Sequence, residues 1–384
     1  MTRAIAATGV AAAGAALPFA LEMRWRRAAQ PATDAWRRLA VQPRGRTQLG
    51  ISLRIPQVEA FALEVMPTLD RLLPYPFRVL RLGAYWNRIE PAPGVFRTDE
   101  LDRLLERAEH AGKEIVLGLG AVKNFGYPEL FVPAHRLPVP LPEGRLITGS
   151  SHPALLEGAE EQVRRLVERY RTHPSIVAWQ VEHEAVDPLG AEHSWRLAES
   201  FVEREVAAVR AADPHRPVLL NGFLPTSLLV RLFQGWRTRD QGDSLQVAQR
   251  LGDTVGVDYY PRHAVLATGA RSIYLDARQS PFSSRRLRHL LLSSRSSGRA
   301  IWIAEGQAEP WEAVTVAPDP RGETMYSCGP AEMIRAYDDC RRAASDVGVE
   351  LGAYLFWGAE YWVRRALGGD QRYLEAFRRV LEES

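Results

Sequence analysis

The sequence predicts a (β/α)8 TIM barrel with long loops at the C-terminal face of its strands. From Arg44 onward, short β-branched runs alternate with longer amphipathic stretches, which indicates repeated βα units around a parallel sheet. Eight such runs can be counted, and eight strands close this barrel. The chain of 384 residues exceeds the roughly 250 that a barrel needs, so one barrel with insertions fits residues 44–384.

The eight expected strands are short apolar runs rich in Val, Ile and Leu. They lie at Gln48–Leu53, Val79–Leu82, Ile115–Leu119, Ile176–Val181, Val218–Asn221, Thr254–Val257, Ala300–Ala304 and Gly352–Phe356. Residues 99–112 and 156–170 have the apolar spacing of amphipathic helices that join such strands. The connections at 120–153 and 223–249 are longer, and both follow strand ends at the face where barrels build a substrate cleft.

The N-terminal residues 1–43 are expected to be a signal-like or anchoring segment followed by a linker. Residues 4–21 form an apolar, Ala-rich stretch after Arg3, and further arginines follow at positions 24, 26 and 27. This pattern favours an exported or membrane-anchored protein, with membrane association through residues 4–21. A cytoplasmic enzyme with an extra N-terminal helix is the alternative.

Charge and cysteine content exclude several classes of protein. The net charge of +3 is small, and basic residues alternate with acidic ones, so nucleic acid is not expected as a partner. Cys328 and Cys340 are the only cysteines, too few for a disulfide framework or a thiolate zinc site. The histidines do not show metal-ligand spacing either, and neither a metal nor a cofactor is expected.

Two expected strands end in glutamate. The fourth runs into Trp-Gln-Val-Glu-His-Glu, ending at Glu184, and the seventh runs into Ile-Trp-Ile-Ala-Glu-Gly, which contains Glu305. Strands four and seven lie on opposite sides of an eight-strand ring, so these side chains can face each other across its mouth. Hydrolysis of a glycosidic bond with retention needs two such carboxyl groups, one protonated and one ionised. A separation of about 5 Å is expected between them.

These motifs resemble clan A of the glycoside hydrolases, barrels in which strand four ends in Asn-Glu and strand seven in Glu. Residues 180–184, Gln-Val-Glu-His-Glu, are similar to the Gln-Val-Glu-Asn-Glu of the family thirty-five β-galactosidases. Residues 81–91, Arg-Leu-Gly-Ala-Tyr-Trp-Asn-Arg-Ile-Glu-Pro, resemble the second strand of the cellulase-like family five. The resemblance covers roughly residues 50–362.

The resemblance implies a retaining O-glycosyl hydrolase that acts on an oligosaccharide, polysaccharide or glycoside, with β-linked substrates favoured. It makes Glu184 the acid/base and Glu305 the nucleophile. Four substrate-binding residues also match: Arg81 and Tyr260 as partners of the nucleophile, Trp357 as the floor of the sugar subsite, and His183 in place of the clan's asparagine. Arg81 and Tyr260 are therefore expected within hydrogen-bonding reach of Glu305.

His183 is the departure from the clan's pattern. Its ring is expected to point into the cleft beside Glu184, with one nitrogen free for the substrate's 2-hydroxyl. Because imidazole differs from an amide in geometry and can become charged, a carbohydrate-binding barrel without turnover is the alternative function. Glu182 lies two residues before Glu184, on the same face of an ideal strand, and is an alternative catalytic group. The sequence leaves the sugar and its linkage open.

Overall fold

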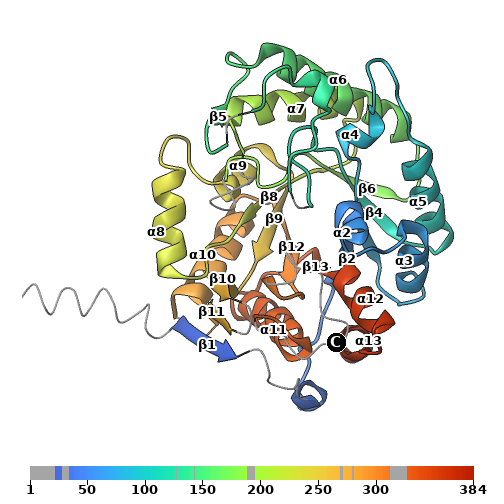
Figure 1. The fold of residues 1–384 in the computed structure, drawn as a ribbon. Coiled ribbons are helices and arrows are strands. Elements are labelled where there is room, and N and C mark those ends of the chain that lie inside the picture. The colour runs from blue at the N-terminus through green and yellow to red at the C-terminus, as the bar shows by residue number, and fades with distance from the viewer. Residues whose placement is uncertain are drawn as a thin grey trace, which may run out of the picture.

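The computed structural model describes residues 22–27, 34–126, 128–141, 143–187, 195–268, 271–278, 281–311 and 327–384. Its centre is a closed barrel of eight parallel strands surrounded by helices (Figure 1). In chain order the barrel strands are β2 (Gln48–Leu53), β3 (Val79–Gly83), β4 (Glu114–Gly118), β6 (Ile176–Gln180), β8 (Val218–Phe223), β9 (Thr254–Tyr259), β12 (Ala300–Gln307) and β13 (Ala353–Trp357). The predicted fold class is confirmed.

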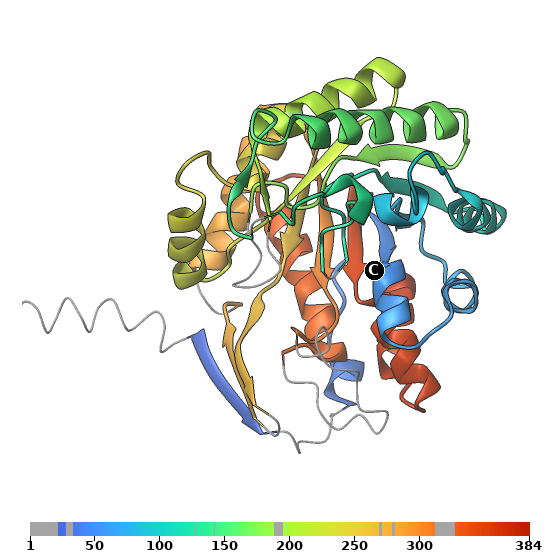
Figure 2. The ribbon, with the colours of Figure 1, turned by 45° about the horizontal axis from the view of Figure 1, so that its top comes forward.

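The helices cover the outside of the barrel and bury its main apolar cluster against the strands. They are α2 (Ile55–Ala60), α3 (Val65–Leu72), α4 (Trp86–Ile89), α5 (Asp99–His110), α6 (Pro153–Tyr170), α7 (Glu199–Ala212), α8 (Leu228–Arg237), α9 (Ser244–Leu251), α10 (Pro281–Ser296), α11 (Pro330–Asp346), α12 (Ala359–Leu367) and α13 (Arg372–Glu383), with 3-10 turns η1 (Asp34–Arg38) and η2 (Ala134–Arg136). A second, small cluster fills the barrel axis, and its members are Val79, Val116, Ala178, Ala353 and Leu355. Figure 2 shows the helices wrapped around the strands.

Strand boundaries differ from the prediction where the functional residues lie. The fourth strand ends at Gln180, before the expected Val181, and the seventh continues to Gln307, three residues beyond the expected Ala304. Glu305 is therefore part of β12, where it pairs with Asp258 of β9. Hydrophobic runs predict the apolar part of a strand, and they miss polar residues that pair at its end.

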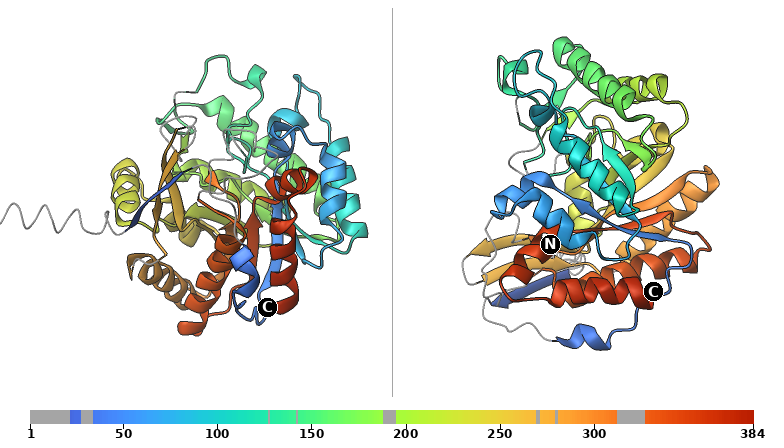
Figure 3. Two further views of the ribbon diagram at one scale, coloured as in Figure 1. Left: turned by 60° about the horizontal axis from the view of Figure 1, so that its bottom comes forward. Right: turned by 90° about the vertical axis from the view of Figure 1, so that its right-hand side faces the viewer.

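A three-stranded antiparallel sheet is attached to the barrel, and the sequence did not predict it. It consists of β1 (Met23–Arg27), β11 (Arg271–Asp276) and β10 (Arg262–Thr268), in that order. Because β10 directly follows the C-terminal end of β9, the sheet projects from the mouth side of the barrel (Figure 3). A further pair, β5 (Leu146–Ile147) and β7 (Arg196–Leu197), joins the long connections after β4 and β6.

The segment expected as a linker contains ordered structure. Within residues 1–43, β1 pairs with β11, and Trp36 of η1 is buried, its carbonyl accepting a hydrogen bond from Arg379 of α13. The apolar stretch 4–21 lies outside the described residues. Among the helices that are described, none combines the length and apolar character needed to cross a membrane.

Candidate active site

Glu305 lies at the end of β12 and receives a hydrogen bond on each carboxylate oxygen. The Arg81 guanidinium of β3 is 2.7 Å from Oε1, and the Tyr260 hydroxyl donates to Oε2 at 2.6 Å. Both predicted contacts are confirmed. The Glu305 side chain is 2% exposed, so these two charge-assisted hydrogen bonds lie almost entirely out of solvent. Burial raises the pKa of the Tyr260 hydroxyl well above its usual value, so it remains a donor.

Arg81 is fixed by contacts on several sides. Its Nε donates to Gln180 Oε1 at 2.6 Å and its Nη1 to the carbonyl of Ala304 at 3.3 Å. The guanidinium lies 4.0 Å from the ring centre of Phe125, a cation–π contact. Contacts from two strands, β6 and β12, and from the loop that carries Phe125 thus hold the cation in place beside Glu305.

Glu184 follows β6 in a turn that departs from extended geometry. Its φ is +41° and that of Glu182 is +52°, a region that non-glycine residues adopt at an energetic cost. The side chain is 1% exposed, and its Oε2 has no hydrogen-bond partner among the described residues. Burial raises the pKa of Glu184 well above the usual value, and the negative charges of Asp258 and Glu305 raise it further. These surroundings therefore favour the protonated form of the Glu184 carboxyl group.

Asn221 of β8 forms hydrogen bonds with both Asp258 and the backbone of Glu184. Its Nδ2 donates to Asp258 Oδ2 at 2.6 Å, while its Oδ1 accepts from Gln180 Nε2 at 3.0 Å and from the Glu184 backbone amide at 3.3 Å. Burial and the charge of Glu305 raise the pKa of Asp258 well above its usual value. Asp258 is a site residue that sequence reasoning missed, although it lies two positions before Tyr260.

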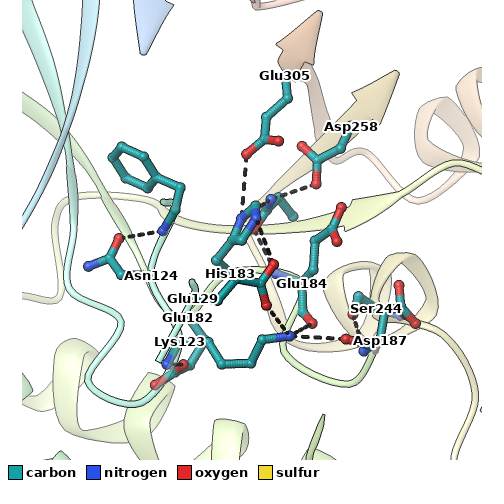
Figure 4. Close-up of polar contacts among 12 residues, drawn as sticks. Lys123, Asn124, Glu129, Glu182, His183, Glu184, Asp187, Ser244, Asp258 and Glu305 are labelled. Atoms are coloured by element: carbon teal, nitrogen blue, oxygen red, sulfur yellow. Dashed lines mark hydrogen bonds and ion pairs between the residues drawn. The ribbon is translucent and has the colours of Figure 1, made fainter. Parts of the chain in front are cut away.

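The imidazole of His183 lies between the carboxyl groups of Glu305 and Glu129 (Figure 4). Its Nδ1 is 3.0 Å from Asn221 Nδ2 and 3.4 Å from Glu305 Oε1. Since the amide nitrogen can only donate, Nδ1 accepts and the proton resides on Nε2. Burial lowers the pKa of His183 well below its usual value, and Arg81 and Lys123 lower it further, so the ring is neutral. The imidazole of His183 therefore does not become positively charged in the way that the sequence alone allowed.

Nε2 of His183 faces a carboxyl group that the sequence analysis did not single out. It is 3.7 Å from Glu129 Oε1, beyond hydrogen-bonding distance. Glu129 belongs to the connection after β4 and is 1% exposed, with Lys123 Nζ 3.1 Å from its Oε2. Burial raises the pKa of Glu129 to about 7, opposed by the charge of Lys123.

Lys123 holds this corner of the site together. Its Nζ donates to the carbonyls of Glu184 at 2.7 Å and Asp187 at 3.0 Å, in addition to its ion pair with Glu129 (Figure 4). Neither Glu129 nor Lys123 lies in a periodic strand or helix pattern. The sequence could have indicated Glu129 and Lys123 as site residues only through their position in the long connection after β4, because loops at this face of a barrel carry function.

Glu182 has contacts that are structural. Its carboxylate accepts from the backbone amides of Val122 at 2.9 Å and Lys123 at 2.5 Å, and it adjoins Glu205 of α7. The alternation expected for an ideal strand does not apply, because β6 has already ended and the chain turns at Glu182. A Cβ at Gly120 would lie 2.0 Å from the Lys123 carbonyl, so only glycine allows this loop to fold so tightly against the turn. These contacts hold the Glu182 carboxylate against the loop after β4, away from Glu305.

Trp357, at the end of β13, belongs to the site and not to the main core. It packs with Phe125 and Tyr260 in a separate cluster, and its ring is nearly parallel to that of His183, with centroids 6.2 Å apart. The Arg54 guanidinium lies 4.2 Å from its ring centre, and Glu309 and Glu360 form ion pairs with it. Arg54 directly follows β2, the strand that pairs with β13. Its placement is that expected of a sugar platform; the role itself stays a prediction.

Some of these side chains have the spacing of metal ligands. His183 lies with Glu129 and Glu184, and again with Asp258 and Glu305, with all ligand atoms of each trio within 4.8 Å of one another. Arg81 already neutralises Glu305, and Lys123 is paired with Glu129. We therefore assign no ion to either trio. Cys328 and Cys340 are buried and free.

Part of the chain is similar in sequence to known β-galactosidases. A family model described as β-galactosidase matches residues 75–203, which include Arg81, Glu129 and Glu184. The β-galactosidases of Geobacillus kaustophilus and Alicyclobacillus acidocaldarius are each 31% identical, over 115 and 121 residues. The aligned part is 28% of this chain and 17% of either relative.

Solved structures extend the similarity to the whole barrel. The GH5_18 protein of Streptomyces cattleya, solved with GlcNAc, has a TM-score of 0.55 at 16% identity, covering 88% of this chain and 81% of that one. Xylanase 10B of Thermotoga petrophila, solved with xylobiose, has a TM-score of 0.52 at 14% identity, covering 88% and 94%. The fold is thus that of the clan A barrel glycoside hydrolases. Residues 75–203 are in addition similar in sequence to the β-galactosidases.

Proposed function

We propose that this protein is a retaining β-glycoside hydrolase, with Glu184 as acid/base and Glu305 as nucleophile. The observation that carries the proposal is the unequal environment of two buried glutamates. Arg81 and Tyr260 contact Glu305, whereas burial among other acids raises the pKa of Glu184. Two titratable groups whose surroundings favour opposite protonation states are the signature of a nucleophile and a general acid.

The proposed reaction has two displacements. Glu305 Oε attacks the anomeric carbon while Glu184 gives its proton to the leaving oxygen, so that a glycosyl ester forms and the aglycone departs. Glu184, now ionised, takes a proton from water, which attacks the anomeric carbon and releases Glu305. The unpartnered Oε2 of Glu184 suits both transfers. The carboxyl separation of about 5 Å that retention requires stays a prediction.

For the substrate, we propose a β-galactoside. The support is the β-galactosidase family model, whose matched segment includes Arg81, Glu129 and Glu184, together with the two β-galactosidase relatives. A barrel that binds sugars without turnover is less well supported, because it would have no need of two buried glutamates in such unequal surroundings.

A mechanism-based label tests the proposal. A 2-deoxy-2-fluoro-β-galactoside with an activated leaving group should form a slowly hydrolysed ester on Glu305, because the fluorine destabilises the oxocarbenium-like transition state of both steps. We expect the intact mass to increase by one fluorogalactosyl group, and peptide mapping to place it on Glu305. Labelling of Glu184 or Glu182 would refute the assignment, and labelling only by gluco or manno analogues would refute the substrate.

The role of His183 is tested by a pair of substitutions. His183→Ala should reduce kcat/KM by about tenfold to a thousandfold, equivalent to ~1.4 to 4 kcal/mol, because a hydrogen bond to the 2-hydroxyl strengthens in the transition state. His183→Asn restores the clan's amide and should retain more activity. Steady-state kinetics on an aryl galactoside and its 2-deoxy analogue provide the measurement. An alanine variant with parental kcat/KM would show that His183 does not contact the substrate.

A further inference from the structure

Helix α8 has its apolar face outward. Of the eight large hydrophobic side chains that are exposed in the described chain, four lie on this one helix: Leu229 (40%), Leu232 (61%), Phe233 (53%) and Trp236 (62%). Their spacing places them along one side of the helix. The only buried residue of α8 is Gln234, whose amide donates to Asp187 Oδ2 at 3.1 Å.

This orientation is the reverse of that in an ordinary surface helix, which buries its apolar stripe and exposes its polar side. The hydrogen bond from Gln234 attaches α8 to a residue of the site, because the carbonyl of the same Asp187 accepts a hydrogen bond from Lys123. The contact of Gln234 with Asp187 therefore fixes the orientation of α8, with its apolar side chains toward solvent. Contiguous exposed apolar surface of this kind marks a docking site.

The chain itself indicates what the helix faces. Figures 1 and 2 place the N-terminal end of β1 on the same side of the barrel as α8. The apolar stretch 4–21 leads directly into β1, which begins at Met23. A bilayer that holds this stretch would thus lie against the side of the barrel that carries α8.

The composition of α8 fits a bilayer surface. Trp, Phe and Leu on one face, flanked by cationic side chains, are typical of helices that lie in the interface between headgroups and acyl chains. Arg231 and Arg239 are exposed beside the apolar residues, while the nearby Asp240 is paired with Arg196. The exposed charge is thus positive, which favours anionic headgroups.

We propose that α8 is an interfacial docking helix that seats the barrel on an anionic bilayer, next to an anchor formed by residues 4–21. Since α8 follows the C-terminal end of β8, docking would hold the mouth side of the barrel close to the lipid surface. The proposal does not depend on the reaction assigned to the site.

Hydrogen exchange of the full chain, with and without vesicles of phosphatidylcholine and phosphatidylglycerol, tests the proposal. We expect exchange of the 228–237 amides to slow by roughly tenfold or more with vesicles, because an inserted helix loses contact with water. Leu232→Asp should abolish this protection. The double variant Phe233→Gln/Trp236→Gln should weaken it without adding charge. Leu367→Asp on α12, also an exposed leucine (49%), is the matched control and should keep it.

Three outcomes would overturn the proposal. If the chain floats with vesicles while exchange in α8 is unchanged, residues 4–21 alone hold the membrane. If α8 is protected without lipid in proportion to protein concentration, a second copy covers it. If soluble oligosaccharides protect α8 and vesicles do not, Phe233 and Trp236 form a sugar platform. The thermal unfolding midpoint of each variant should equal that of the parent. A loss of slowed exchange in α8 then reflects loss of docking and not unfolding.

Discussion

Glu305→Ala should reduce turnover of an aryl β-galactoside by roughly 10⁴-fold or more, because the covalent route loses its nucleophile. The substitution also leaves a small cavity beside the Arg81 guanidinium, which lies 2.7 Å from the missing oxygen. Azide can occupy this cavity and attack the anomeric carbon from the nucleophile's side. We therefore expect azide to restore activity and to yield the α-galactosyl azide, identified by nuclear magnetic resonance of the product.

The matched control for this variant is Glu182→Ala. Glu182 is another buried glutamate of the site region, bonded to the Val122 and Lys123 amides. It should lose stability, yet azide should give no α-galactosyl azide, because no nucleophile has been removed. If Glu305→Ala retains parental activity, or if its azide product has the β configuration, Glu305 is not the nucleophile.

Glu184→Ala should give a different pattern, because it removes the proton donor and leaves the nucleophile. We expect kcat/KM to fall by roughly 10² to 10⁴-fold for substrates with a poor leaving group, which need protonation. Dinitrophenyl galactosides need little protonation and should still form the glycosyl enzyme. Azide then intercepts that intermediate from the opposite face and should yield the β-galactosyl azide. If this variant yields the α-galactosyl azide, Glu184 is the nucleophile and Glu305 the acid/base.

The pH profile of the parent belongs to the same prediction. A raised pKa means that Glu184 stays protonated to a higher pH than an ordinary carboxyl group. Activity that requires the protonated acid is therefore present at lower pH and is lost as pH rises through this pKa. In Glu184→Ala with a dinitrophenyl galactoside, this alkaline decline in kcat/KM should disappear. A decline that remains unchanged in the variant would assign it to another group.

Local sequence patterns were sufficient for much of the barrel and for the pair of glutamates. Each barrel strand is a short apolar run, and a residue at the end of a parallel strand faces the mouth whatever its neighbours are. Glu305 lies on such a strand, whereas Glu184 lies in the turn after β6, and the motif that follows the fourth apolar run singled it out together with Glu182. The contacts of Arg81 and Tyr260 with Glu305 were expected from the resemblance to clan A, because position alone does not select Arg81 in the middle of β3 or Tyr260 directly after β9.

The long connections could not be predicted, because their contacts depend on residues far away in the sequence. Glu129 and Lys123 meet the Glu184 turn about sixty residues later, and no periodicity marks them. The pairing of β1 with β11 joins residues some 250 positions apart. The outward face of α8 also follows from tertiary contacts, since its apolar spacing is that of a helix packed against a core.

The sequence by itself thus determined the barrel, because the number of strands follows from local hydrophobic patterns, and it singled out two glutamates beside the predicted strand ends. Only the tertiary structure decided how these glutamates differ. Arg81 and the Tyr260 hydroxyl reach Glu305 from two other strands, while burial beside Asp258 raises the pKa of Glu184. A protonation state depends on which charges and donors surround a group in space, and folding alone brings these together.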